Sequence, residues 1–151
     1  MGGGTSGKVG LRMAYKGYLK KDALRNYFPM PNAIFNLDLT TGELAVYAYL
    51  MFCENRKTYQ CYPSFRTIGA AVDMSRPTVK KHVDGLVEKG LIYTEPTSIF
   101  TKAGKKQNGS LLYTIRPIKE AQQLHYERQL LRFEEDAAKQ ESAAGDRRLR
   151  K

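Results

Sequence analysis

Apolar residues recur at helical spacing in three successive segments in the middle of this chain. The first segment begins after Thr40 and extends to about Asn55, and its apolar positions are Leu44, Tyr47, Ala48, Leu50 and Met51. Thr40 and Glu43 have the spacing of a capping box, in which each side chain bonds the backbone N–H of the other residue. The pattern therefore predicts a helix whose first turn is fixed locally.

Two further helices are predicted after it, separated by a tight turn at Asp73 and Met74. Ser64 opens the earlier helix, with inward positions at Phe65, Ile68, Ala71 and Val72. Ser75 opens the later helix, with a core stripe of Val79, Val83, Leu86 and Val87. Serine is a favoured N-cap, and Gly90 is placed to end the later helix after Lys89.

Beyond Gly90 the hydrophobic period changes from 3.6 to 2. Residues 91–94 and 111–115 are predicted to be strands, and the turn-rich segment 96–110 between them is predicted to be a long hairpin tip. Three helices followed by a hairpin predict a mainly α fold with a small β-hairpin (α+β). Its architecture is a winged helix-turn-helix with an N-terminal extension and a C-terminal helix.

Four parts are expected along the chain. Residues 1–35 are a partly disordered N-terminal extension, with one short helix over 18–27 and an extended segment over 28–31, where two prolines restrict the backbone. Residues 36–117 are the winged helix-turn-helix domain. Residues 118–140 are the C-terminal helix, and residues 141–151 are a disordered basic tail.

The C-terminal helix carries one narrow apolar stripe on a strongly charged background. Its members are Tyr126, Leu130, Phe133 and Ala137. The stripe is shorter than three heptads, which is short for a coiled coil. Burial against the body of the same chain and a homodimer contact both remain open for it.

The net charge of +10 favours a polyanionic partner. Residues 40–117 hold eleven basic and six acidic groups, whereas residues 118–151 hold eight and seven, so the excess lies toward the predicted domain. Outside its core stripe, the third helix presents Arg76, Thr78, Lys80 and Lys81 near its start. Arginine and lysine can hydrogen-bond guanine, and threonine can meet a thymine methyl group or a phosphate. Double-stranded DNA is the predicted partner.

Enzymatic and membrane functions find little support in the sequence. The two cysteines, Cys53 and Cys61, and the two histidines, His82 and His125, have no zinc-site spacing, and no phosphate loop or nucleophile elbow is present. We therefore predict no catalytic residue, metal site or cofactor. Cys53 is expected in the core, with a disulfide to Cys61 left open. No apolar run approaches the roughly 20 residues of a membrane span, and no signal-peptide core precedes the domain, so a cytoplasmic location is expected.

Three stretches carry a resemblance to known DNA-binding domains: Pro63 to Gly69, Met74 to Lys80, and Leu86 to Ile92. They resemble the DNA-binding domain of GntR-type regulators. They are equally similar to the N-terminal winged-helix domain of the replication initiator protein A class of Gram-positive plasmids and mobile elements. The upstream segment from Asn26 to Phe35 favours the initiators.

The resemblance implies a set of DNA contacts. Arg66 would grip DNA at the groove edge, and Ser75, Arg76, Thr78 and Lys80 would contact it from the recognition helix. Lys102, Lys105 and Lys106 are placed on the wing by their charge alone, and a solvated loop is the alternative for them. GntR-type regulators also have a large C-terminal effector domain, which does not fit in the roughly 35 residues after the hairpin.

We therefore expect sequence-specific double-stranded DNA binding through the recognition helix (75–89) and the basic wing (96–110). The protein would act as a transcriptional regulator or as a replication initiator of a plasmid or mobile element. The alternative is a winged-helix module that binds proteins, which would favour an apolar or acidic outer face on the third helix.

Overall fold

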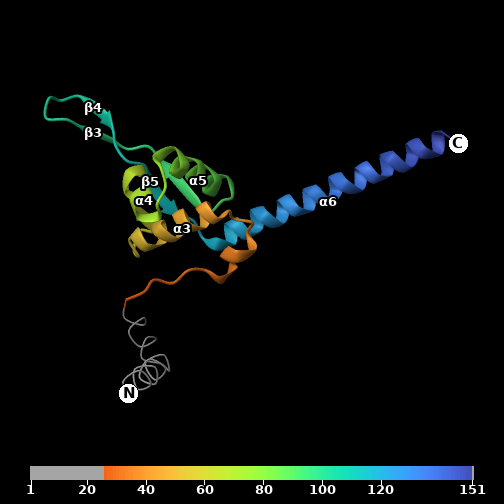
Figure 1. Ribbon diagram of the computed structural model, residues 1–151, viewed down its shortest axis with the longest axis horizontal. Helices are drawn as coiled ribbons and strands as arrows, with labels where there is room; N and C mark the ends of the chain where they lie inside the picture. Colours follow the sequence, from red (N-terminus) through yellow and green to blue (C-terminus); the bar gives the residue numbers. More distant parts are fainter. Residues whose placement is uncertain (1–25, 151) are drawn as a thin grey trace, which may run out of the picture.

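The computed structural model describes residues 26–150, and its fold is the expected winged helix-turn-helix (Figure 1). Within residues 26–150, the structure has one short 3-10 helix, four α-helices, a three-stranded antiparallel sheet and a separate two-stranded ladder. The helices are η1 (Asn32–Asn36), α3 (Thr41–Cys53), α4 (Phe65–Val72), α5 (Arg76–Glu88) and α6 (Ile118–Leu149). The strands are β1 (Gln60–Cys61), β2 (Ile92–Glu95), β3 (Ser98–Phe100), β4 (Lys106–Asn108) and β5 (Leu112–Ile115).

The three predicted helix starts are confirmed, because each is set by a residue pair three positions apart. The Thr40 hydroxyl accepts the backbone N–H of Glu43 at 3.2 Å, and the Glu43 carboxylate accepts the N–H of Thr40 at 3.3 Å. Ser64 and Ser75 likewise cap α4 and α5 through their hydroxyls. Such caps each stabilise a helix by about 1 kcal/mol.

The end of α5 is also as predicted. Gly90 has a φ of +79°, and its N–H donates to the Val87 carbonyl while the N–H of Leu91 donates to the Leu86 carbonyl. These two bonds form a Schellman motif, which satisfies carbonyls that the helix end leaves free. The motif turns the chain into β2.

Two inward positions were predicted wrongly. Val79, Val83 and Leu86 are fully buried, but Val87 is exposed, because it lies at the edge of the core-facing stripe. Ala71 is exposed in the last turn of α4, whereas Ile68 is buried.

The tip of the wing is more ordered than the predicted loop. β5 lies between β1 and β2 in a three-stranded antiparallel sheet, with Cys61 opposite Tyr113 and Ile92 opposite Ile115. Beyond it, β3 and β4 form a separate two-stranded ladder in which Phe100 is opposite Lys106. The expected turn-rich tip is therefore a second hairpin. Its backbone N–H and C=O groups pair with each other, because this segment lies beyond the helical body. It extends away from the body (Figure 1).

The N-terminal boundary also differs from the expected one. Ile34 of η1 is fully buried in the core, so the domain takes in residues that had been assigned to the extension. The extended backbone expected over 28–31 is observed at Pro31, whose φ is −63° and ψ is 133°. The short helix expected over 18–27 falls almost wholly outside the described residues.

The C-terminal helix α6 is longer than predicted. It continues to Leu149, so residues 141–149 are helical and the expected disordered tail is wrong. Ala143 and Ala144 are strong helix formers, no proline interrupts the segment, and Arg147 and Arg148 complement the negative end of the helix dipole.

Only the start of α6 packs on the body. Ala121 is buried, and Ala121 and Leu124 lie against Gly90, where a side chain would leave less room. An Arg128 guanidinium nitrogen donates to the Glu88 carbonyl at 2.8 Å. From Gln129 onward every described residue is exposed, and the helix projects opposite to the wing (Figure 1).

A buried ion pair joins α3 to the end of α5. Glu43 is 4% exposed, and its Oε1 accepts from Lys89 Nζ at 2.9 Å. Lys89 Nζ also donates to the Asp38 carbonyl at 2.7 Å. Burial raises the pKa of Glu43, but the hydrogen bonds from Lys89 and Thr40 and the Lys89 charge outweigh it, so the net pKa is lowered. Glu43 is therefore held ionised within the helical core.

The two cysteines are free thiols, so the disulfide alternative is wrong. Cys61 is buried and Cys53 is half-buried at the edge of the core. Burial raises the pKa of the Cys61 thiol to about 12, and the thiol donates to the Leu50 carbonyl at 3.7 Å. Cys61 therefore stays protonated as a core residue.

Candidate nucleic-acid interface

The turn between α4 and α5 sets how α5 projects from the body. Asp73 ends α4 in the left-handed region, with a φ of 57°, and the N–H of Met74 donates to the Gly69 carbonyl at 2.9 Å. A Cβ on Gly69 would collide with the Met74 carbonyl oxygen. Gly69 therefore permits the close approach that lets Ser75 start the next helix at once.

The outward face of α5 carries the predicted basic residues. Arg76, Lys80 and Lys81 are exposed, and Thr78 is half-exposed. Lys80 Nζ lies 3.0 Å from an Asp84 carboxylate oxygen, in a pair that is about two-thirds exposed on both sides. Exposed i,i+4 pairs of this kind contribute about 0.3–0.5 kcal/mol, so Lys80 can exchange Asp84 for a phosphate at little cost.

Ser75 and Thr78 are engaged with each other at the start of α5. Their hydroxyl oxygens lie 2.8 Å apart, and the Ser75 hydroxyl also accepts the backbone N–H of Thr78 at 3.4 Å. The structure thus gives Ser75 a capping role as well as an exposed position. Thr78 is half-exposed, so part of its side chain remains accessible for a contact.

A groove separates α5 and the start of α4 from the wing. Small polar groups, a lysine and apolar side chains line it. Its lining residues are Ser64, Phe65, Lys80, Ile99, Asn108, Gly109, Ser110 and Leu111. The tertiary structure thereby places the wing and the recognition helix on either side of one groove.

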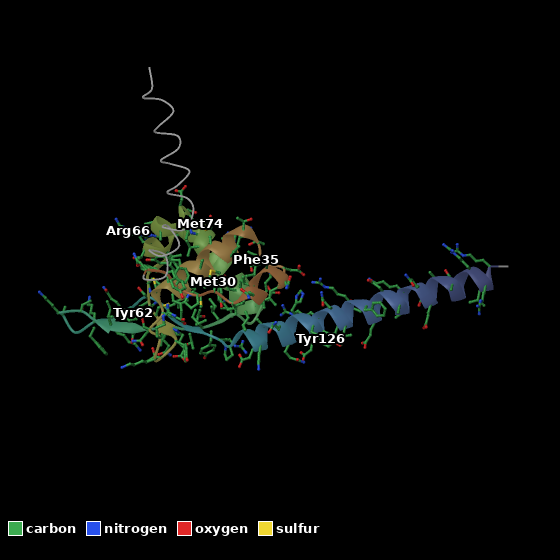
Figure 2. The ribbon with its side chains drawn as sticks, turned by 90° about the horizontal axis from the view of Figure 1, so that it is seen from below. Met30, Phe35, Tyr62, Arg66, Met74 and Tyr126 are labelled. Carbon is green, nitrogen blue, oxygen red and sulfur yellow. The ribbon has the colours of Figure 1, made fainter. Side chains whose placement is uncertain are left out.

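The remaining predicted contacts lie around this groove or beyond it. Arg66 is exposed on α4, at the end of the body from which the wing extends, and the exposed Tyr62 lies at the same end (Figure 2). Tyr126 lies on α6, on the opposite side of the body (Figure 2). Lys102, Lys105 and Lys106 are exposed at and beside the tip of the β3–β4 hairpin, beyond the groove. Residues 96–115 contain no acidic residue, so the wing is uniformly basic.

Several groove residues escaped the sequence analysis. Ser64 was identified only as a cap, and Asn108 and Ser110 only as turn residues. Their convergence depends on how the wing folds back beside α4, for which short polar segments give no sequence signal.

His82 lies at the interface between α3 and α5. The His82 ring packs against Gly42 of α3, where any added Cβ would overlap it. This contact gives His82 a structural role at the α3–α5 interface. Among residues 26–150, no three histidine, cysteine or acidic side chains are grouped closely enough to hold a metal ion.

Comparison with protein families supports the helix-turn-helix part of the fold. Residues 37–92 match the family model of a helix-turn-helix domain. These residues form a helix-turn-helix domain.

The matched segment runs from the end of η1 to the first residue of β2, so it includes α5 and leaves out the wing and α6. A solved structure described as a possible transcriptional regulator from Methanosarcina mazei Go1 is similar with a TM-score of 0.43 and 17% identity, over 70% of this chain and 78% of that chain. No curated protein matches the chain. In the part of the chain that the structure describes, no helix is long and apolar enough to cross a membrane.

Proposed function

We propose that this chain binds double-stranded DNA with sequence specificity, through α5 in the major groove and the basic wing on the neighbouring backbone. The observation that carries the proposal is that one groove lies between α5, which contributes Lys80, and the wing, which contributes Asn108 and Ser110. The three wing lysines are exposed farther out on the same hairpin. The major groove is about 12 Å wide and admits one α-helix. A phosphate strand lying between α5 and the wing would meet Lys80 together with the polar groups of Ser64 and Asn108.

The proposed contacts divide into two groups. Arg66, Lys81 and the wing lysines would bind phosphates and supply most of the affinity, which is independent of sequence. Arg76, with Lys80 and Thr78, would contact base edges and supply specificity. Ser75 would hold the first turn of α5 in place for both groups, because its hydroxyl is bonded to Thr78.

The proposed biological role is that of a transcriptional regulator or of a replication initiator of a plasmid or mobile element. Selection of bound sites from a random duplex library tests both. A discrete motif bound about a thousandfold more tightly than scrambled DNA supports specific recognition. Inverted half-sites favour a regulator and direct repeats an initiator. Failure to select any motif would contradict the proposal and favour a protein-binding module.

The wing lysines give a prediction about salt dependence. Replacing Lys105 and Lys106 together by alanine should weaken binding to all sequences alike, because phosphate contacts carry no sequence information. Each lost phosphate contact should lower the slope of log K against log salt by about 0.9. The measurement is binding to cognate and scrambled duplexes across a salt series. Lys119 and Lys139 of α6, both replaced by alanine, form a charge-matched control. An unchanged slope in the wing variant would remove the wing from the interface.

We also propose that α6 pairs with a second copy of this chain. Tyr126, Leu130 and Phe133 are 57%, 44% and 76% exposed, so the stripe is not buried in its own core as one alternative expected. The exposed segment 129–149 is about 30 Å long at 1.5 Å per residue. The stripe residues Tyr126, Leu130, Phe133 and Ala137 are 4, 3 and 4 residues apart, which is the spacing of helices that pair along one face.

Replacing Leu130 and Phe133 together by glutamate should give a monomer where the parent is a dimer, because charged side chains would have to be buried at the contact. Sedimentation velocity measures the change. Gln129→Glu with Lys139→Gln is the control, since it makes the same change in net charge on exposed positions off the stripe. A parent that stays monomeric at every concentration would contradict pairing through α6.

A further inference from the structure

The β3–β4 hairpin carries two large apolar side chains that contribute nothing to the core. Ile99 is 55% exposed and Phe100 is 74% exposed, and all six residues of the two strands are exposed. Gly104 at the tip has nothing within 4 Å of the position that a Cβ would take. Phe100 is exposed on a projecting ribbon, so it buries little surface within the folded chain. Its placement points to a contact with another molecule.

The surroundings of Phe100 fit a polyanion. Lys106 is directly opposite Phe100 in the ladder, and Lys102 and Lys105 lie in the turn that joins the two strands. No acidic residue occurs anywhere from 96 to 115. An aromatic ring surrounded by lysines suits the bases and phosphates of a nucleic acid, because the ring can stack while the ammonium groups neutralise the backbone.

The two apolar side chains point to different faces of the ribbon. Ile99 lines the groove that Lys80 also lines. Successive strand residues alternate sides, so Phe100 lies on the opposite face, away from α5. A duplex strand lying in the groove would therefore pass Ile99, while Phe100 would face the minor groove beyond that strand.

An undistorted minor groove leaves little room for this ribbon. The groove is about 6 Å wide, whereas the backbones of two paired strands alone are about 4.8 Å apart before side chains are added. Entry of the tip therefore requires the groove to open. Apolar side chains inserted between base steps from the minor groove do this, and they kink the duplex by about 20–90°.

We propose that Phe100 is a wedge that inserts between two base pairs from the minor groove and bends the DNA bound by α5. The proposal rests on the DNA binding proposed above and adds a residue, a groove and a deformation to it. Flexible pyrimidine–purine steps are the expected insertion points, because they unstack most easily.

The test uses the full chain and the duplex selected as its binding site. Bending is measured by energy transfer between dyes at the two duplex ends, and unstacking by the fluorescence of 2-aminopurine placed in turn at each step beneath the wing. The variant is Phe100→Ala, and the control is Phe35→Ala. Phe35 is 77% exposed on η1 and matches Phe100 in exposure and chemistry.

The parent and the Phe35→Ala control should bend the duplex and raise 2-aminopurine fluorescence at one step. Phe100→Ala should lose both signals while still binding, about five- to thirtyfold more weakly. Phe100→Leu should keep much of the bend, because leucine also acts as a wedge.

Two outcomes would overturn the wedge while leaving DNA binding intact: a parent complex with straight DNA, or a saturated Phe100→Ala complex with the parent's bend and fluorescence. A parent that binds no duplex would instead overturn the proposed function, and the wedge with it.

Discussion

Replacing Lys89 by methionine should lower the free energy of unfolding by about 3 kcal/mol, at the low end of the range for breaking a buried ion pair. Methionine keeps most of the aliphatic stem but removes the ammonium group that donates to Glu43. Glu43 then remains ionised and buried without a counterion, and a second carboxylate oxygen, Oε2, already has no hydrogen-bond partner. Urea denaturation at pH 7 measures the change.

The control for this prediction is the same substitution at an exposed pair. Lys80→Met also removes an ammonium group from a carboxylate, but the pair with Asp84 is solvated and should contribute less than about 0.5 kcal/mol. A double variant, Glu43→Gln with Lys89→Met, should be more stable than Lys89→Met alone, because glutamine is neutral and can keep the capping-box bond to Thr40. Equal losses in the Lys80 and Lys89 variants would contradict a buried-pair role.

Acid should change the contribution of Glu43 to stability in opposite directions in the parent and in Lys89→Met. In the parent the pKa of Glu43 is lowered, so its contribution to stability is present above the unfolded-state pKa of about 4.3 and is lost as the pH falls through the folded-state pKa. Without Lys89, burial should raise the pKa of Glu43. The deficit of Lys89→Met relative to Lys80→Met should then shrink between pH 7 and pH 4, because protonated Glu43 is easier to bury.

Arg76→Ala should weaken binding to the selected DNA site by about 1–3 kcal/mol and relax discrimination at one base pair. Arg76 is the first residue of α5 and is exposed on its outward side. A guanidinium can donate two parallel hydrogen bonds to the O6 and N7 atoms of guanine. Competition binding against each single-base variant of the site locates the affected position.

Arg76→Lys separates charge from geometry in this test. Lysine keeps the positive charge but loses the bidentate fork, so specificity should fall almost as far as in Arg76→Ala while binding to scrambled DNA stays near the parent's. Arg132→Ala, on the exposed part of α6, is the control for loss of one arginine. If Arg76→Ala binds cognate and scrambled DNA as the parent does, Arg76 does not read a base.

The sequence alone determined the helix-turn-helix and its boundaries. The capping box of Thr40 and Glu43, the caps at Ser64 and Ser75, and the stop at Gly90 were all predicted and are all observed. Each depends on bonds between residues three to five positions apart. Such signals can be recognised in the sequence alone, because the residues that form these bonds are close together along the chain.

The tertiary structure alone decided the position of the groove, the ladder in the wing and the exposure of the apolar stripe on α6. The groove brings Lys80 beside Asn108 and Ser64, which are far apart in the chain, and the β3–β4 ladder formed where turn residues predicted a loop. On α6 the sequence offered one narrow apolar stripe, and its period could not choose between burial on the body and contact with a second copy. The small Gly90 admitted Ala121 and Leu124 and left Leu130 and Phe133 outside. These outcomes depend on which surfaces meet after folding, and no local spacing carries that information.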